Sequence, residues 1–212
     1  MITVPGLVRR ISTAGRLLRN DPTGLFRYIF GSVARYSVFY ADSGDIPPAV
    51  LPDGFSFRRL TDQELLCHAE DWPDIRETRE WFVNPDAGVV YALFQGTRLA
   101  HVAWLVTADQ NAARMRSVRL LRLRPGEAEI TGCFTPPDFR GRGVYAVCIH
   151  QLFSVARALG VSRIFMVTRI ENVASRRGIA KAGLREAEGH ISFVRCLAYC
   201  HFIWRRLKGI YP

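Results

Sequence analysis

The sequence predicts a mixed α/β (α+β) fold in which a mostly antiparallel sheet is flanked by helices and follows a basic helical N-terminal extension. Two apolar segments on either side of Gln95, Gly96 and Thr97 have the pattern of an antiparallel hairpin. From residue 127 onward the apolar periodicity switches between strand and helix. The first 40 residues hold six arginines and one acid, with apolar residues at helical spacing.

Size and composition favour one catalytic domain with an extension. The 212 residues are 49% hydrophobic and 23% charged, which is typical of globular proteins. No apolar run reaches about 18 residues, the length that could span a bilayer, and the start lacks the pattern of a secretory signal, so we expect a cytoplasmic protein. The five cysteines form no CxxC pair, so neither a disulfide framework nor a metal site is expected.

The formal charge of +10 is distributed unevenly along the chain. Residues 1–40 carry +5, residues 41–90 carry −7 and residues 91–212 carry +12. A basic C-terminal half suits a polyanionic ligand, which could be a nucleotide-bearing cofactor, an anionic membrane surface or nucleic acid. Charge alone does not choose among these ligands.

The extension and its linker are expected to cover residues 1–53, with the main domain at 54–212. Residues 6–20 have the pattern of a short basic amphipathic helix, and an aspartate-proline pair after it opens a second helical stretch. A strand is expected at 36–41. The helices either pack on the domain or dock on an anionic membrane or a partner. Docking on the membrane would place the protein at its inner face.

The main domain is expected to begin with a strand at 55–60, followed by two helices in the acidic stretch 61–84. Residues 61–64 have the form of a capping box, which marks the start of the first helix. The hairpin strands are expected at 89–94 and 98–106.

A basic segment follows at 114–124, where five arginines alternate in part with apolar residues and no acid is present. A strand with one solvated basic face is the simplest interpretation. Nucleic acid binding is the alternative, but the segment contains no base-stacking aromatic residue, so no nucleic acid partner is expected.

The strand, glycine-rich turn and helix between residues 127 and 160 are the most informative segment. Alternation with period two predicts one strand face formed by Glu127, Glu129, Thr131, Cys133 and Thr135. After two prolines and the turn, an apolar stripe predicts a helix that stops at Gly160. Glycines in such a turn let several N–H groups and the positive helix end point at one anion, and Arg140 and Arg142 would add charged contacts. The turn is therefore either a phosphate site or a plain tight turn, and the absence of the Walker lysine and of the GxGxxG spacing counts against a nucleotide triphosphatase or a dinucleotide fold.

This segment resembles the GNAT superfamily of acyl-CoA-dependent N-acyltransferases at two motifs. In that family an Arg or Gln, two residues, Gly, one residue and then Gly or Ala bind the pyrophosphate of acyl-CoA. Arg140, Gly143 and Tyr145 fall on this frame. The second motif, an Asn with a small residue three positions on and a Lys-x-Gly ending, matches Asn172, Ser175 and the end of the following helix.

The resemblance covers residues 54–200 and implies a GNAT-like fold that uses acetyl-CoA or another acyl-CoA as co-substrate. The residues it implies at the acyl-CoA site are Phe134, Thr135, Arg140, Gly141, Arg142, Gly143, Val144, Tyr145, Asn172 and Ser175. Two positions depart from the family pattern. Tyr145 stands where a small residue is usual, and Ile179 stands where many members place the tyrosine that protonates the departing thiolate. The general acid therefore has no assignment.

The reaction implied by the resemblance is direct attack of a neutral amine on the thioester carbonyl, which needs a base and an oxyanion donor. In the family a backbone N–H polarises the carbonyl where the strand before the turn leaves its neighbour, and here that region is 133–135. Glu129 and Glu127 lie upstream, where the family often has a catalytic carboxylate, so either is a candidate base, directly or through water. The alternative is that both line a solvated strand face.

We therefore expect an N-acyltransferase, most directly an N-acetyltransferase, that acts on a small-molecule amine. Residues 134–145 are also similar to GNAT-like proteins among bacterial polysaccharide biosynthesis enzymes, which suggests an amino sugar as the acceptor. An acidic acyl carrier protein is a further candidate partner of the basic surface. The alternative function is a GNAT-like scaffold that binds acyl-CoA or a membrane without turnover.

Overall fold

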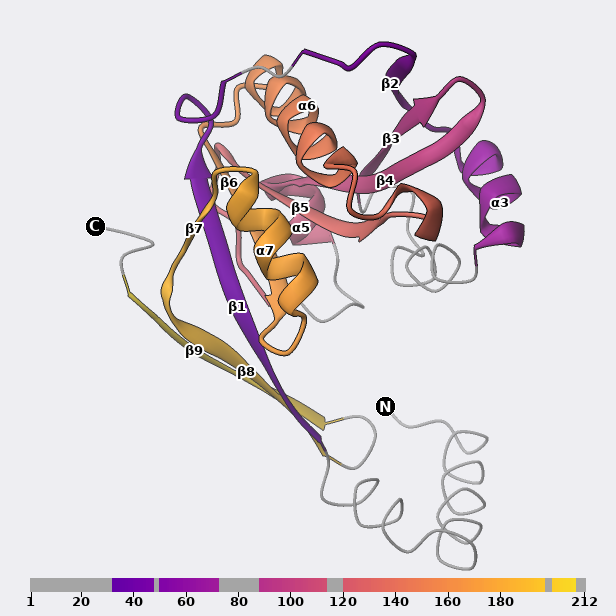
Figure 1. The fold of residues 1–212 in the computed structure, drawn as a ribbon. Helices are drawn as coiled ribbons and strands as arrows, with labels where there is room; N and C mark the ends of the chain where they lie inside the picture. Colours follow the sequence, from indigo (N-terminus) through magenta and orange to yellow (C-terminus); the bar gives the residue numbers. More distant parts are fainter. Residues whose placement is uncertain (1–31, 48–49, 73–87, 114–119, 197–199, 209–212) are drawn as a thin grey trace, which may run out of the picture.

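A computed structural model of the chain describes residues 32–47, 50–72, 88–113, 120–196 and 200–208, which form one twisted sheet with helices on both faces (Figure 1). The strands are β1 (Ser32–Asp42), β2 (Phe55–Arg59), β3 (Val89–Gln95), β4 (Arg98–Thr107), β5 (Glu127–Phe134), β6 (Arg163–Arg169), β7 (Arg185–Glu186), β8 (Glu188–Cys196) and β9 (Cys200–Lys208). The helices are α3 (Asp62–Asp71), α5 (Ala108–Ala113), α6 (Val144–Ala158) and α7 (Val173–Lys181), with a short 3-10 helix at Pro137–Phe139.

The sheet is mixed and mostly antiparallel, which confirms the predicted fold class. Its strand order is β2-β3-β4-β5-β6-β1-β8-β9, with β7 also paired to β1. Within the described residues, the pairing of β5 with β6 is parallel and every other pairing is antiparallel. The hairpin predicted around residue 96 is formed by β3 and β4.

The first strand lies inside the sheet although it precedes the domain start predicted at residue 54. β1 pairs with β6 on one side, where Val38 lies opposite Val167, and with β8 on the other. The sheet is therefore built from chain on both sides of that predicted start. The helices predicted for the N-terminal extension fall in 1–31, outside the described residues. In the part of the chain that is described, no helix is long and apolar enough to cross a membrane.

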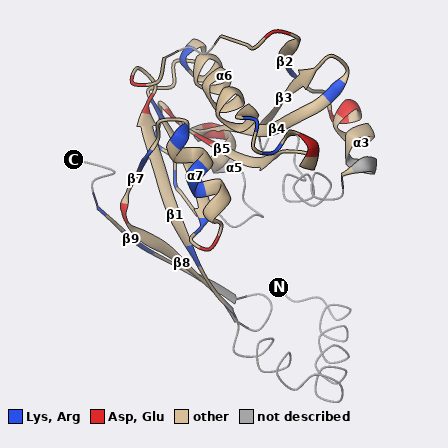
Figure 2. Cartoon of the chain, in the orientation of Figure 1, with Lys and Arg blue, Asp and Glu red and all other residues tan. Residues whose placement is uncertain are grey.

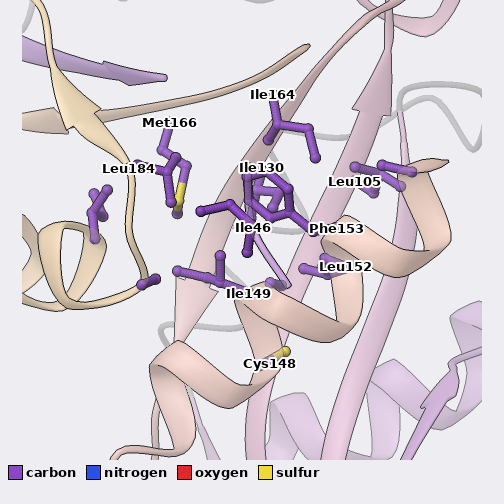
Figure 3. Packing of buried hydrophobic residues seen from close by; sticks show 14 of the residues in the cluster. Ile46, Leu105, Ile130, Cys148, Ile149, Leu152, Phe153, Ile164, Met166 and Leu184 are labelled. Atoms are coloured by element: carbon purple, nitrogen blue, oxygen red, sulfur yellow. The ribbon is translucent and has the colours of Figure 1, made fainter. Parts of the chain in front are cut away.

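Helices α6 and α7 cover one face of the sheet and enclose the main apolar core. Close-packed side chains of α6 meet side chains from the strands below, and Figure 3 labels among them Leu105, Ile130, Cys148, Ile149, Leu152, Phe153, Ile164 and Met166. Burying each of the larger aliphatic or aromatic side chains contributes about 1.5–3 kcal/mol, so this core fixes where α6 begins relative to β5.

Helix α3 packs on the opposite face and starts with the predicted capping box. Thr61 accepts a hydrogen bond from the backbone N–H of Glu64, whose carboxylate in turn accepts from the backbone N–H of Thr61. These bonds, together with the guanidinium of Arg58, lower the pKa of Glu64 to about 2. Leu65 then buries against a second apolar cluster that includes Trp104. The second helix predicted before residue 84 falls in 73–87, outside the described residues.

The strand predicted at 114–124 is wrong for its described part. Residues 114–119 lie outside the description, and residues 120–126 form an irregular connection. Its backbone groups pair with side chains instead of a neighbouring strand: Leu123 donates to the Asn111 side chain, and the carbonyl of Leu120 accepts from Arg205. The short helix α5, which holds Asn111, was not predicted.

Candidate active site

The β5 and β6 strands separate halfway along their length. They pair in parallel from Glu127 and Arg163 to Ile130 and Met166. Beyond this point β5 continues with β4 alone and β6 continues with β1, so no described ladder joins the two strands. Backbone groups along the opening can then bind a ligand in place of a neighbouring strand.

A β-bulge at the start of the opening changes which side chains face α6. Trp104 lies opposite Thr131, but Val102 lies opposite Phe134, so β5 has one extra residue here. Gly132 has a φ of +60°, a conformation that favours glycine. The predicted single face is therefore wrong beyond Thr131, because Cys133 packs with the core below α6 while Phe134 joins the cluster on the opposite face.

The predicted glycine-rich turn leads directly from this strand end into α6. Gly141 and Gly143 have φ values of +76° and +78°, and a Cβ atom on either would meet no atom within 4 Å. Gly143 is the N-cap of α6 and no side chain caps the helix, so the N–H groups of the first turn, which begins at Val144, have no partner within the helix. This geometry suits an anion that approaches the positive end of a long helix.

Arginines surround the turn. The Nε atom of Arg140 donates to the carbonyl of Thr135 at 3.0 Å, which ties the turn to the end of β5. The guanidinium of Arg142 lies 5.6 Å from the ring centre of Phe139. Helix α7, beside the opening, contributes three basic residues and no acid (Figure 2). Arg140 and Arg142 place positive charge at the turn itself, as a phosphate group needs, whereas Arg176 of α7 is paired with Glu186 at 3.0 Å.

Tyr145 lies in the middle of this region. Its ring packs on Gly178 of α7, where an added Cβ would approach the ring to 3.0 Å. It meets the His101 ring edge-on with 5.2 Å between centroids. Its hydroxyl is 3.5 Å from the Ser175 hydroxyl and shares a hydrogen bond with the Cys133 thiol. Burial and the neighbouring thiol raise the pKa of Tyr145 well above its usual value, so the phenol stays protonated.

His101 is a site residue that sequence reasoning did not select. It is fully buried in β4, and its Nδ1 atom is 2.7 Å from the hydroxyl of Thr135. Burial lowers the pKa of His101 to about 3, so the ring is neutral near pH 7. Its position as the one polar side chain in the apolar run 99–106 is a signal that could have identified it.

Cys133 is poorly suited to act as a nucleophile. Burial raises the pKa of its thiol to about 12, and burial also raises the pKa of the nearby Cys148 thiol. Because the thiolate is the reactive form, both sulfurs are unreactive near neutral pH.

The second motif builds the start of α7. The side chain of Asn172 caps the helix by accepting from the backbone N–H of Ser175 at 3.1 Å. One turn after Ser175, Ile179 is 1% exposed and belongs to the apolar core. The side chain at position 179 therefore serves packing, and this position supplies no proton donor.

The two candidate bases lie on the face of β5 that points away from α6. Glu127 and Glu129 are each 7% exposed, so the alternative of a solvated strand face is wrong. Glu127 accepts a hydrogen bond from the backbone N–H of Arg124 at 2.7 Å. Glu129 directly precedes Ile130, the last β5 residue that pairs with β6, and is the closer of the two acids in sequence to the opening. No group of three metal-ligating side chains occurs among the described residues.

Solved structures share the fold. A GNAT-family protein from Novosphingobium aromaticivorans aligns with a TM-score of 0.51 and 20% identity, covering 77% of this chain and 64% of that one. An acetyltransferase from the GNAT family of Colwellia psychrerythraea aligns with a TM-score of 0.53 and 13% identity, covering 88% of this chain and 62% of that one.

A third structure is the glucosamine N-acetyltransferase region of a fungal multi-domain beta-N-acetylglucosaminidase. It has a TM-score of 0.53 and 13% identity, and the alignment covers 76% of this chain and 20% of that one. This chain thus spans less than two thirds of each of these three proteins. Among curated proteins no sequence matches significantly.

The sequence also matches the family model described as Acetyltransferase (GNAT) family over residues 57–184, which is more than half of the chain. The matched stretch contains the opening between β5 and β6, the glycine-rich turn, α6 and α7. The chain belongs to the GNAT family of acetyltransferases.

Proposed function

We propose that the protein transfers an acyl group, acetyl in the simplest case, from an acyl-CoA to an amine. One observation carries the proposal: β5 leaves β6 immediately before the glycine-rich turn at the start of α6. A thioester lying in the opening would meet backbone N–H groups of residues 131–135, while its phosphates reach the helix end. N-acyl transfer, rather than acyl transfer to another atom, is part of this proposal.

The donor would be held chiefly by backbone groups. The N–H groups at Gly141, Gly143, Val144 and Tyr145 would bind the pyrophosphate, with Arg140 and Arg142 adding charge. Phe134 and Thr135 lie at the end of β5, where the pantetheine arm would run past the opening. Asn172 and Ser175, at the start of α7, would line the other side of the donor.

Glu129 is the candidate base that the geometry favours over Glu127. It directly precedes Ile130, the last β5 residue that pairs with β6, whereas Glu127 lies two residues further from the opening. A base on the face away from α6 implies that the amine approaches from that face. Glu129 would remove the amine proton directly or through one water molecule.

An amino sugar is the acceptor we would test first, as the similarity to polysaccharide enzymes suggests. The fold accommodates such an acceptor in at least one protein, the fungal glucosamine N-acetyltransferase region. Two further proposals are an acyl carrier protein as the donor and membrane contact through the N-terminal extension. Both would involve the basic surface together with residues that lie outside the described part of the chain.

Calorimetric titration with acetyl-CoA tests the donor site. Gly143→Asp should abolish micromolar binding, because it places a carboxylate where the phosphates would lie and repels them. Gly160→Asp is the matched control: Gly160 has a φ of +76°, open space around its Cβ position, and lies at the other end of α6. It carries the same charge change and similar backbone strain without touching the site.

The outcomes separate the two candidate functions. Binding by wild type and Gly160→Asp, lost in Gly143→Asp, supports the donor site. Binding followed by acetyl transfer to glucosamine or another amine supports the enzyme, while binding with no transfer to any amine supports the scaffold. Absence of acetyl-CoA binding by the wild-type protein contradicts the proposed site.

A further inference from the structure

In the proposed acyl transfer, thioester cleavage leaves a thiolate at the opening between β5 and β6, and the phenol of Tyr145 lies beside that opening. When the tetrahedral intermediate collapses, the carbon–sulfur bond breaks and both electrons go to sulfur. A thiolate generated away from water leaves more readily if a nearby acid supplies a proton. The side chain at position 179 is apolar and buried in the core, so the donor must come from elsewhere.

The phenol of Tyr145, which belongs to α6, contacts residues of three other elements at the opening. Its ring rests on Gly178 of α7 and on the edge of His101 from β4. Its hydroxyl shares a hydrogen bond with Cys133, the residue after the β5 bulge, and lies 3.5 Å from Ser175. These contacts place one phenolic O–H between the end of β5 and the start of α7, beside the proposed path of the thioester.

We propose that Tyr145 is the catalytic acid that protonates the departing CoA thiolate, and that Ser175 relays the replacement proton to Tyr145. This assignment rests on the proposed acyl transfer. The amine nitrogen forms its bond to the acyl carbon, the carbon–sulfur bond breaks, and the phenol proton moves to sulfur. The phenolate then takes the hydroxyl proton of Ser175, which is restored from solvent, while the amine proton leaves through the base.

The surroundings of the two hydroxyls fit these roles. Desolvation and the neighbouring Cys133 raise the pKa of Tyr145 well above its ordinary value of 10, so the phenol keeps its proton throughout the usual assay range. Ser175 is half-buried in the first turn of α7, next to exposed Ala174, and its hydroxyl is 3.5 Å from the phenol. Asn172 fixes the backbone of Ser175 through the helix cap. A proton can therefore reach the phenol without opening the core.

Removal of the hydroxyl alone tests the assignment. Thiol release from acetyl-CoA would be followed with glucosamine and a panel of other primary amines. Tyr145→Phe should lower kcat by about 100-fold or more while KM and the calorimetric Kd for acetyl-CoA change by less than about twofold, because the ring contacts remain. Ser175→Ala should lower kcat less, since water can replace a relay. Tyr91→Phe, which alters a half-buried tyrosine stacked on Phe57, is the control and should leave kcat unchanged.

Chemical rescue separates the hydroxyl from the ring. Tyr145→Ala, the small residue type usual at this position, leaves a cavity that a free aromatic molecule can enter. Phenol should restore part of the kcat of this variant, whereas benzene should not. Equal rates with the two additives, or a wild-type kcat in Tyr145→Phe, would overturn the assignment and leave the proposed function intact. A wild-type protein that binds no acetyl-CoA or releases no thiol would instead overturn the proposed function, and this assignment with it.

Discussion

The two halves of β5 have different neighbours and different chemistry. Residues 127–130 lie between β4 and β6, and their α6-facing side chains belong to the apolar core. Residues 131–134 keep β4, lose β6 and contain the bulge at Gly132. Around this second half gather hydroxyl, thiol and imidazole groups from four elements. The comparison teaches that the candidate site forms where the ladder opens, while the well-packed half holds α6 in position.

The largest expected effect comes from damaging the packed half. Leu152 of α6 is fully buried in the core that it shares with Ile130. Leu152→Ala should lower the free energy of unfolding by about 2–5 kcal/mol, because it removes buried methyl groups and leaves a cavity. Urea denaturation measures this loss. The Kd for acetyl-CoA of the folded fraction should stay the same, and a loss below about 1 kcal/mol would contradict a rigid core here.

The next largest effect is expected when the two acids that precede the opening are substituted one at a time. Glu129→Gln should lower kcat/KM by about 100-fold or more, equivalent to about 2.7 kcal/mol of transition-state stabilisation. Glu127→Gln is the matched control and should change kcat/KM by less than about fivefold, since it lies two residues further from the opening. Steady-state kinetics with an identified amine checks both variants. The reverse order of effects would make Glu127 the base.

Straightening the bulge should lower stability less than Leu152→Ala does, and it should clearly change acetyl-CoA binding. Gly132→Ala places a Cβ on a residue with φ of +60°, which costs about 1–2 kcal/mol. If the chain relieves this strain by straightening, Cys133 and Phe134 exchange faces. Thermal unfolding measures the first effect and acetyl-CoA calorimetry the second. Full stability together with full binding would show that the bulge is not needed.

The last expected effect is a gradual change of stability with pH, small within any one pH unit. His101 has a folded-state pKa of about 3, below the unfolded value of about 6.5, so the unfolded chain binds more protons between these values. Stability should therefore be full above pH 6.5 and fall as the pH drops towards 3, by at most about 1.4 kcal/mol per pH unit from this group.

His101→Phe should flatten this dependence between pH 6.5 and 5, whatever its effect on absolute stability. This window lies above the region where Glu64 begins to take up protons, since the folded pKa of Glu64 is lowered to about 2 from an ordinary 4.5. Urea titrations at several pH values would measure the slope. A variant with the slope of the wild type would mean that His101 is not the group responsible.

Local patterns in the sequence were sufficient to predict most helices and strands of the well-packed part of the fold. The capping box at Thr61, the hairpin of β3 and β4, and the strand, turn and helix up to Gly160 depend on contacts between residues close in sequence. The place of β1 in the middle of the sheet was not predicted, because pairing between distant segments leaves no local periodicity.

The region around the opening between β5 and β6 was predicted less completely, for a physical reason. The glycine-rich turn was predicted correctly because positive φ angles demand glycine, as Gly141 and Gly143 show. A single glycine in a strand, such as Gly132, is compatible with either a regular strand or a bulge, so the faces beyond it were assigned wrongly. The meeting of His101 with Tyr145 joins two elements 44 positions apart and needs the tertiary structure.

The contact between Tyr145 and Gly178 limits which pairs of residues can occupy the two positions. A Cβ at position 178 would approach the Tyr145 ring to 3.0 Å, so a side chain there is compatible only with a smaller residue or a displaced ring at position 145. Relatives that keep a bulky aromatic residue at the first position should therefore keep glycine at the second, whereas relatives with alanine or glycine at the first can vary at the second. The residues at positions 145 and 178 would then vary together among relatives, and the pair would indicate which lineages place a phenol between α6 and α7.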